Sequence, residues 1–163
     1  MNKKVSWCRR SFLASLAAGL MLVAGVLMTN AQAQTAKPTQ DDAKALTLKA
    51  AEIVKAKGID EAAKLFNQEG EFKYGEIYVT VIDIKGNWVV YPPKPAAVGN
   101  SILGFVDPDG KKIGEDIVAA GMKGEGWVEY RWKNPVSNKI EPKVTFVKKI
   151  EGTDYLTYVG IYK

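Results

Sequence analysis

The spacing of apolar residues changes once along the chain, near residue 70, and this change limits the folds it can form. Before it, apolar side chains recur every three or four positions, which predicts one helix that opens at Asp41-Asp42 and ends at Gly58, and a second from Glu61 to Asn67. After it, β-branched and aromatic runs predict strands at 77–84, 88–91, 127–132, 143–149 and 155–162, with one further helix at 113–122. Because short connections require antiparallel pairing, we predict an α+β fold.

The first 33 residues have the features of a secretory signal peptide. Four basic residues and no acid occupy positions 1–10, an apolar run extends from Phe12 to Met28, and Ala31-Gln32-Ala33 supplies the small residues that a signal peptidase requires. We expect cleavage near Ala33-Gln34, a flexible leader over 34–41 and a mature domain over 42–163, periplasmic or secreted. A retained membrane anchor is the alternative, because the apolar run is near the minimum for a bilayer span.

The export route is left open by the basic segment. Arg9-Arg10 stands directly ahead of the apolar run and is followed by Ser11-Phe12-Leu13, as in the twin-arginine signal. The same two arginines also serve as the ordinary basic head of a signal peptide. Both routes lead out of the cytoplasm.

Composition excludes several kinds of chemistry from the mature part. The only cysteine, Cys8, lies in the signal segment, and the chain has no histidine. Metal and haem sites built on these ligands are therefore excluded, as are Ser-His-Asp and Cys-His catalysis. Four of the 23 basic residues and none of the 18 acidic residues leave with the signal, so the mature net charge is +1. We expect no enzyme activity, no cofactor and no nucleic-acid partner.

Short motifs follow one another through the mature chain in a specific order and spacing. They are Tyr78-Val79 with Asp83 and Gly86, Tyr91-Pro92, Gly99-Asn100, Asp107-Pro108-Asp109-Gly110-Lys111, the stretch Gly124 to Trp132, Pro142-Lys143, and Val159-Gly160-Ile161-Tyr162. In this order they resemble the single Cache domain family (sCache_2-like), small extracytoplasmic sensor modules of bacterial receptors. The resemblance covers residues 44–163. Many relatives have His-Pro where this chain has Tyr91-Pro92, which removes an imidazole contact.

The resemblance implies a specific architecture. A long N-terminal helix would pack across a central, PAS-like antiparallel sheet of about five strands. A short helix and loops would enclose a ligand pocket on the other face of the sheet. In related domains the ligand is often a short carboxylate or an amino acid.

Strand alternation and the family pattern together suggest ligand-binding residues. Along 127–132, Tyr130 and Trp132 share one face, where they either wall the pocket or belong to the core. Lys143 opens the next strand, and its ammonium would pair with a ligand carboxylate. The alternatives for Lys143 are a solvated side chain or an ion pair with Glu129 or Glu141.

Four further residues complete the candidate site. Tyr78 and Tyr91 would add hydroxyl groups, and Pro92 would shape the rim of the pocket. Arg131 could clamp a carboxylate with its planar guanidinium, although strand alternation places it on the face opposite Tyr130. The Asp107–Lys111 stretch resembles the start of a calcium loop, but Lys111 occupies a ligand position, so we expect a plain turn there.

We therefore predict a periplasmic sensor domain that binds a small organic ligand, with a short carboxylate favoured, and does no chemistry on it. After the last strand the sequence has no second apolar span and no output domain, so we expect a partner, such as a membrane receptor or a histidine kinase, to relay the signal. The alternative is an interaction or scaffold protein that keeps the Cache fold without a ligand.

Overall fold

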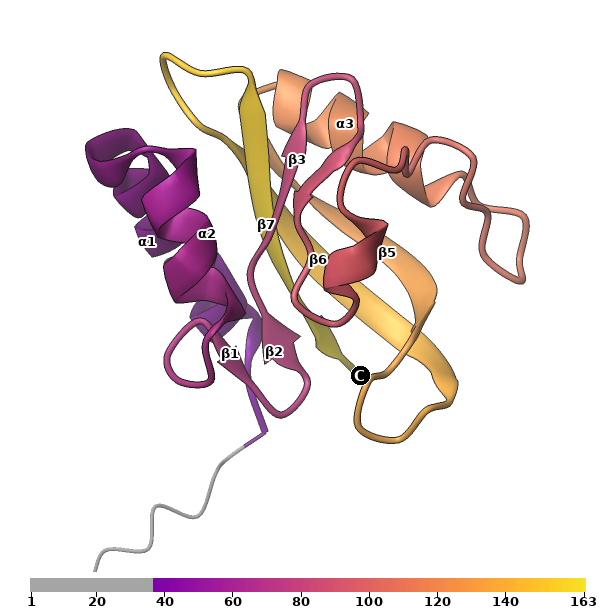
Figure 1. The fold of residues 1–163 in the computed structure, drawn as a ribbon. Coiled ribbons are helices and arrows are strands. Elements are labelled where there is room, and N and C mark those ends of the chain that lie inside the picture. The colour runs from indigo at the N-terminus through magenta and orange to yellow at the C-terminus, as the bar shows by residue number, and fades with distance from the viewer. Residues whose placement is uncertain (1–36) are drawn as a thin grey trace, which may run out of the picture. The chain divides into compact units, whose positions relative to one another are not determined.

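The computed structural model describes residues 37–163, so the predicted signal peptide and the beginning of the leader lie outside the described range. Two helices cover one face of a five-stranded antiparallel sheet, and a third helix with irregular segments covers the other face (Figure 1). This arrangement confirms the predicted α+β class. No helix within the described residues has both the length and the apolar character needed to cross a membrane.

Most elements agree with the predicted ones in type and differ at their ends, but the strand at Lys73–Tyr74 is not among the predicted ones. The elements are α1 (Gln40–Lys57), α2 (Ile59–Asn67), β1 (Lys73–Tyr74), β2 (Ile77–Tyr78), β3 (Thr80–Asp83), β4 (Trp88–Val90), a 3₁₀ turn (Pro95–Ala97), α3 (Ile113–Met122), β5 (Glu125–Lys133), β6 (Ile140–Lys149) and β7 (Tyr155–Tyr162). The predicted strand 77–84 is divided, because β2 pairs with β1 in a separate two-stranded sheet.

Helix α1 begins earlier than predicted. The Thr39 hydroxyl accepts a hydrogen bond from the Asp42 amide at 3.2 Å, and the Asp42 carboxylate accepts one from the Thr39 amide at 2.8 Å. This reciprocal capping box satisfies two backbone donors at the helix start. Residues 40 and 41 therefore belong to the helix, and the predicted leader over 34–41 is too long at its end.

The sheet separates two apolar clusters. Its strand order is β4-β3-β7-β6-β5, and every neighbouring pair is antiparallel. On β6, Val144 packs with α1 and α2, whereas Val147 packs with α3 on the other side. Since side chains alternate along a strand, Lys143 lies on the α3 side, and the strand register places it between Tyr130 of β5 and Tyr162 of β7.

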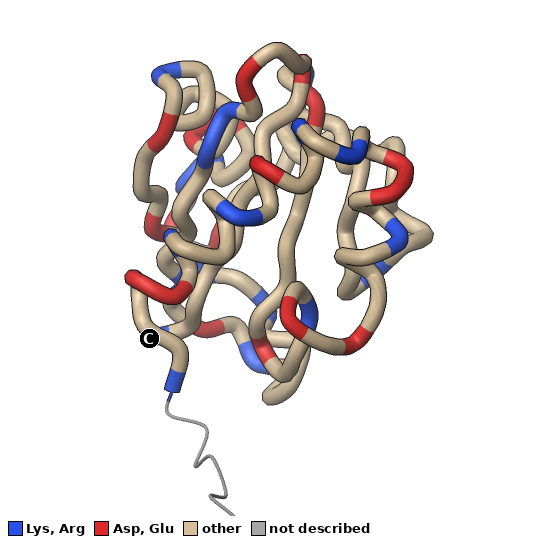
Figure 2. Tube along the Cα trace, turned by 90° about the vertical axis from the view of Figure 1, so that its left-hand side faces the viewer, with Lys and Arg blue, Asp and Glu red and all other residues tan. Residues whose placement is uncertain are grey.

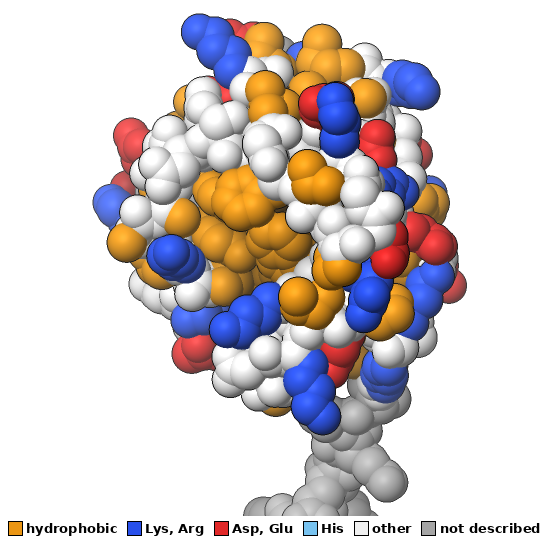
Figure 3. Space-filling model, turned by 90° about the vertical axis from the view of Figure 1, so that its right-hand side faces the viewer, with side chains coloured by type: hydrophobic (Ala, Val, Ile, Leu, Met, Phe, Trp, Pro, Cys, Tyr) orange, Lys and Arg blue, Asp and Glu red, His pale blue; other side chains and the backbone are white. Residues whose placement is uncertain are grey.

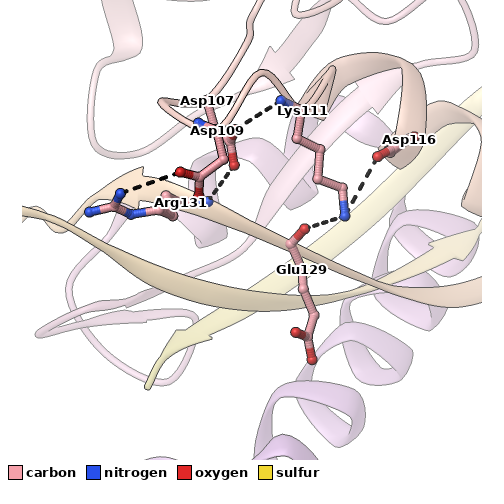
Figure 4. A network of polar contacts seen from close by, with 6 residues as sticks. All are labelled: Asp107, Asp109, Lys111, Asp116, Glu129 and Arg131. Carbon is pink, nitrogen blue, oxygen red and sulfur yellow. Dashed lines mark hydrogen bonds and ion pairs between the residues drawn. The ribbon is translucent and has the colours of Figure 1, made fainter.

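Both edges of the sheet are covered by irregular segments. At β4 the Trp88 amide donates to the Asn100 carbonyl oxygen at 3.0 Å. At β5 the Arg131 amide donates to Asp107 Oδ2 at 3.0 Å, and Lys111 Nζ donates to the Glu129 carbonyl oxygen (Figure 4). These contacts occupy edge groups that would otherwise be open to pairing with another chain.

The Asp107–Lys111 stretch is therefore a structural turn, as predicted. Asp107 Oδ1 accepts hydrogen bonds from the amides of Asp109 and Lys111, each at 2.9 Å, and these bonds help to lower the pKa of the Asp107 carboxyl group. Within residues 37–163 no group of acidic side chains is arranged to hold a metal ion.

Among residues 37–163, the side covered by α1 and α2 carries basic and acidic residues mixed together (Figure 2). Several of them pair, such as Lys55 with Glu151 at 3.4 Å and Lys64 with Glu61 at 2.6 Å. Exposed pairs of this kind contribute little to stability. The features that indicate ligand binding lie on the opposite face of the sheet.

Candidate ligand-binding site

An aromatic cavity, here called the inner chamber, lies between the sheet and α3. It is lined by Tyr78, Trp88, Tyr91, Ile102, Phe105, Ile113, Ile117, Tyr130, Trp132 and Tyr158. Its volume is about 20 Å³, which is room for about one water molecule. A cavity therefore lies on the face of the sheet where the resemblance implies a ligand pocket, and in this conformation it is nearly closed.

A larger cavity, here called the vestibule, lies outside the inner chamber. Its volume is about 470 Å³, and its lining residues are Trp88, Tyr91, Pro93, Lys94, Ala97, Asn100, Phe105, Trp132, Lys133, Pro135 and Asn138. This face of the molecule is hollowed and lined by hydrophobic side chains, with basic side chains around it (Figure 3). Trp88, Tyr91, Phe105 and Trp132 line both cavities and so form the wall between them.

The shared wall is built from packed aromatic rings. Trp88 and Tyr91 stack with ring centroids 4.6 Å apart and an interplanar angle of 9°. Phe105 meets Trp88 and Trp132 edge to face, at centroid distances of 5.3 and 5.6 Å. Phe105 therefore bridges the β4 and β5 sides of the wall, and edge-to-face contacts of this kind are favourable for aromatic rings.

Lys143 lies behind the inner chamber rather than in its lining. Its side chain is 3% exposed. Nζ donates a hydrogen bond to the Tyr78 hydroxyl at 2.7 Å and another to the Tyr162 hydroxyl at 3.4 Å, and it lies 4.2 and 4.5 Å from the two ring centroids. Tyr78 lines the chamber, so the Lys143 ammonium is connected to the chamber through this phenol.

Neither of the alternative environments suggested for Lys143 is present. Its burial excludes a solvated side chain, and no ion pair joins it to an acid within residues 37–163. Glu129 pairs instead with Lys163 at 2.9 Å, and Glu141 accepts hydrogen bonds from Ser137 and Asn134. The amine is therefore buried without a hydrogen-bonded carboxylate from the described part of the chain.

Burial is also the main influence on the protonation of Lys143. It lowers the pKa of the amine from 10.5 to about 7, and the negative charge of Glu76 acts in the opposite direction. Glu76 Oε2 accepts a hydrogen bond from Asn134 Nδ2 at 3.1 Å, whereas Oε1 is buried with no partner among the described residues. Glu76 therefore offsets only part of the cost of burying the amine.

The tyrosines around Lys143 remain neutral over a wide pH range. Burial raises the pKa values of Tyr78, Tyr91, Tyr130, Tyr158 and Tyr162 above 10. Tyr130 shares a hydrogen bond with Thr145 at 2.9 Å, and the Tyr162 hydroxyl donates to the Lys133 carbonyl oxygen at 2.8 Å. Neutral phenols can donate hydrogen bonds to an anion, so the chamber suits a negatively charged ligand.

Gly160 leaves the space that the Lys143 side chain fills. A Cβ atom at this position would lie 2.2 Å from Thr145 Oγ1 and 2.5 Å from Lys143 Cε. We expect Gly160→Ala to lower the free energy of unfolding by about 2 kcal/mol, because the Lys143 stem would be forced from its position. Urea denaturation measures this change. Gly104→Ala, where the added methyl meets no atom within 4 Å, is the control and should change stability little.

The structure brings most of the predicted site residues together. Tyr78, Tyr91, Tyr130 and Trp132 line the inner chamber, with Lys143 behind them. Pro92 is buried but lines neither cavity, and its neighbour Pro93 lines the vestibule instead.

Arg131 lies apart from this group. Its guanidinium Nη1 is 3.7 Å from Asp109 Oδ1, in the polar network at the β5 edge (Figure 4). Strand alternation accounts for the separation, because residue 131 points to the opposite side from Tyr130 and Trp132. The suggested carboxylate clamp by Arg131 is therefore not present in this conformation.

Some lining residues were not identified from the sequence. Trp88 and Tyr158 lie on predicted strands. Once the pairing of the strands is known, side-chain alternation places both residues on the chamber side. Ile113 and Ile117 lie on one side of α3. The sequence predicts this helix but does not indicate that this side faces the chamber. Phe105 lies in an irregular segment, where no periodicity indicates which way a side chain points.

Comparisons with known proteins show which family and which relatives this chain resembles. The model of the Single Cache domain 2 family matches residues 18–163. The sensor histidine kinase MctS of Rhizobium johnstonii is 31% identical over 85 residues, which is 52% of this chain but only 18% of the kinase. This chain therefore corresponds to a small part of that relative's length.

Solved structures of sensor domains share the fold. A methyl-accepting chemotaxis protein from Vibrio parahaemolyticus superimposes with a TM-score of 0.67 at 19% identity, over 75% of this chain and 86% of that one. A Cache chemosensory domain studied for carboxylic acid recognition has a TM-score of 0.60 at 22% identity, over 75% and 86% of the two chains. Cache domains are extracytoplasmic sensors. From the family match and the shared architecture, this chain belongs to the Single Cache domain 2 family.

Proposed function

We propose that this chain is an extracytoplasmic sensor that binds a short organic carboxylate at the inner chamber and relays its occupancy through a partner protein. The observation that carries the proposal is Lys143, a buried amine with no hydrogen-bonded acid partner within residues 37–163. An ammonium in such a place costs several kcal/mol unless a negative charge compensates it. A ligand carboxylate would supply that charge.

The surroundings of Lys143 suit a small acid. Tyr78, Tyr91 and Tyr130 would donate hydrogen bonds from neutral hydroxyl groups, and Trp132 would contact the apolar part of the ligand. The Cache chemosensory domain studied for carboxylic acid recognition has the same fold. Pockets that combine aromatic walls with a few convergent polar groups are typical of small-molecule sites.

Ligand entry requires a change of conformation. The inner chamber has room for about one water, so even a two-carbon acid needs some of the lining side chains to move apart. A ligand that favours the open state shifts the population toward it, and this shift is what a sensor transmits. The partner would be a membrane receptor or a histidine kinase, and the similarity to the sensor histidine kinase MctS supports this proposal.

A thermal-shift panel of short organic acids and amino acids tests the proposal. We expect at least one short carboxylate to raise the melting temperature of the purified protein, and Lys143→Ala to abolish the rise. Lys149→Ala, on the same strand, is the control and should keep it. A flat response of folded protein across the panel would contradict ligand binding, and an unchanged response in Lys143→Ala would remove Lys143 from the site.

Carboxylate affinity should depend on pH in one direction. The unliganded amine has a pKa of about 7, and the bound carboxylate favours its protonated form, so binding takes up a proton above pH 7. We expect the affinity to fall as pH rises from 7 toward 9, by up to about tenfold per pH unit. Calorimetric titrations in buffers of different ionisation enthalpy measure this uptake. An affinity that rises over this range would contradict the assignment.

The small volume of the inner chamber also favours one other function. A Cache domain whose chamber stays closed would act as an interaction or scaffold protein without a ligand. The panel separates the two, because a scaffold protein would respond to none of the acids.

A further inference from the structure

The vestibule has features of a binding site that the inner chamber does not use. Its volume of about 470 Å³ lies within the range of small-molecule pockets. One side is formed by Trp88 and the segment that follows β4, and the other by the end of β5 and the loop before β6. It is open in the present conformation, so a ligand could occupy it without the movement that the inner chamber requires.

The walls of the vestibule are aromatic and partly uncovered. Phe105 is 40% exposed, although it packs against two tryptophans, and Trp132 is half-buried. Pro93 and Pro135 add apolar surface on the two sides. An exposed apolar patch inside a concave surface is typical of a ligand-binding groove. Edge-to-face and offset ring contacts make an aromatic ring a well-matched occupant.

The charges in the vestibule are all of one sign. Lys94 and Lys133 are its only charged lining residues, and neither forms an ion pair within residues 37–163. Other lysines do pair, as Lys111 does with Asp116 at 3.7 Å and Lys148 with Glu125 at 3.0 Å. The side-chain amides of Asn100 and Asn138 provide further donors in the same lining. The site therefore complements a negative charge.

We propose that the vestibule is a second binding site, for an aromatic carboxylate whose ring packs against Phe105 and Trp132 and whose carboxylate pairs with Lys94 or Lys133. The two lysines disfavour a cationic ligand, and the aromatic wall offers a ring more favourable contacts than an aliphatic chain. This inference goes beyond the proposed function, since it does not require Lys143 or an open inner chamber.

Calorimetric titration of the purified protein with phenylacetate tests the proposal. Acetate lacks the ring, 2-phenylethanol lacks the charge, and phenethylamine reverses it. We expect phenylacetate to bind more tightly than all three and to quench tryptophan fluorescence, because the ring contacts Trp132. The double variant Lys94→Ala/Lys133→Ala should weaken phenylacetate binding about fivefold, the effect of removing one exposed ion pair.

Two matched variants make the result specific. Lys85→Ala/Lys123→Ala removes two exposed lysines outside the vestibule and should leave phenylacetate binding unchanged. Lys143→Met should also leave it unchanged, while abolishing the response to short carboxylates. Circular dichroism confirms that each variant is folded.

Four results would overturn the proposal. They are no binding of phenylacetate at millimolar concentration, equal binding of 2-phenylethanol or phenethylamine, acetate binding with the same dependence on Lys94 and Lys133, and loss of phenylacetate binding in Lys143→Met. The last result would place the ring in the inner chamber and would support the proposed function. The short-carboxylate response that depends on Lys143 tests the proposed function, whereas phenylacetate binding tests the vestibule. The two proposals can therefore fail independently.

Discussion

Lys143→Met is expected to make the unliganded protein more stable while abolishing its response to carboxylates. Methionine has a similar length and no charge, so it fills the same space beside Gly160 without the cost of burying an amine. The pKa of Lys143 falls from 10.5 to about 7 on folding. At pH 7 this shift corresponds to a cost of several kcal/mol, since one pKa unit is about 1.4 kcal/mol.

The net gain will be smaller than this cost, because the variant also loses the hydrogen bond from Nζ to Tyr78 and the contacts with two tyrosine rings. We expect a rise in the free energy of unfolding of about 3 kcal/mol, within the range seen when buried charges are replaced by apolar residues. Urea denaturation at pH 7 measures it. A residue whose removal stabilises the fold and abolishes binding is one retained for function rather than for stability.

Lys148→Met is the matched control for this experiment. Lys148 lies on the same strand, and its ammonium pairs with Glu125 at 3.0 Å near the surface. Its replacement should change stability by less than about 1 kcal/mol, as for other exposed ion pairs. If Lys143→Met instead destabilises the protein by more than this amount, the amine is already compensated within the fold, and the argument for a ligand carboxylate fails.

The stability of the unliganded protein should rise with pH from about 7 to 10 and fall above it. Between these values the unfolded chain keeps the Lys143 proton, because the unfolded pKa is 10.5, whereas the folded protein has lost it. The unfolded state therefore binds one more proton, and the free energy of unfolding increases by about 1.4 kcal/mol per pH unit. Below pH 7 both the folded and the unfolded state hold the proton. The contribution of Lys143 to the free energy of unfolding is then constant and at its least favourable value.

Above pH 10 the tyrosines reverse the slope. The pKa values of Tyr78, Tyr130, Tyr158 and Tyr162 are raised by burial, so the folded protein keeps their protons while the unfolded chain loses them near pH 10. The folded state then binds more protons, and stability falls as pH rises. The maximum should lie between about pH 9 and 10.

The composition of the chain makes this profile clear to interpret. There is no histidine, and the only cysteine is Cys8, so few other side chains titrate between pH 6 and 9. Chemical denaturation across this range measures the profile. In Lys143→Met the rise from pH 7 should disappear and the fall above pH 10 should remain. A wild-type profile that is flat from pH 7 to 9 would show that Lys143 keeps its proton in the folded state.

Much of the fold could be predicted from local patterns. Helix α3 and strand β7 have the predicted bounds, and the sheet is antiparallel as the short connections required. The errors lie where tertiary contacts decide. The capping box at Thr39 extends α1 by part of a turn, and the pairing of β2 with β1 divides what the pattern showed as one continuous strand.

The candidate site was predictable where strand alternation applies. Alternation placed Tyr130 and Trp132 together and placed Arg131 on the other side, as observed. Phe105 could not be found in this way, because an irregular segment has no period that fixes the direction of a side chain. Its place in the wall between the two cavities depends on Trp88 and Trp132, which are distant in the sequence.

The sequence by itself determined the order of most elements, the antiparallel sheet, the shared face of Tyr130 and Trp132, and the absence of histidine from the chain and of cysteine from residues 37–163. These properties follow from local periodicity and composition, which act over a few residues. The tertiary structure decided that Lys143 is buried beside Tyr78 and Tyr162 with no ion-pair partner among residues 37–163, and that the aromatic face divides into a nearly closed chamber and an open vestibule. Burial and its effect on a pKa depend on which distant strands and loops come together, and local patterns carry no information about that.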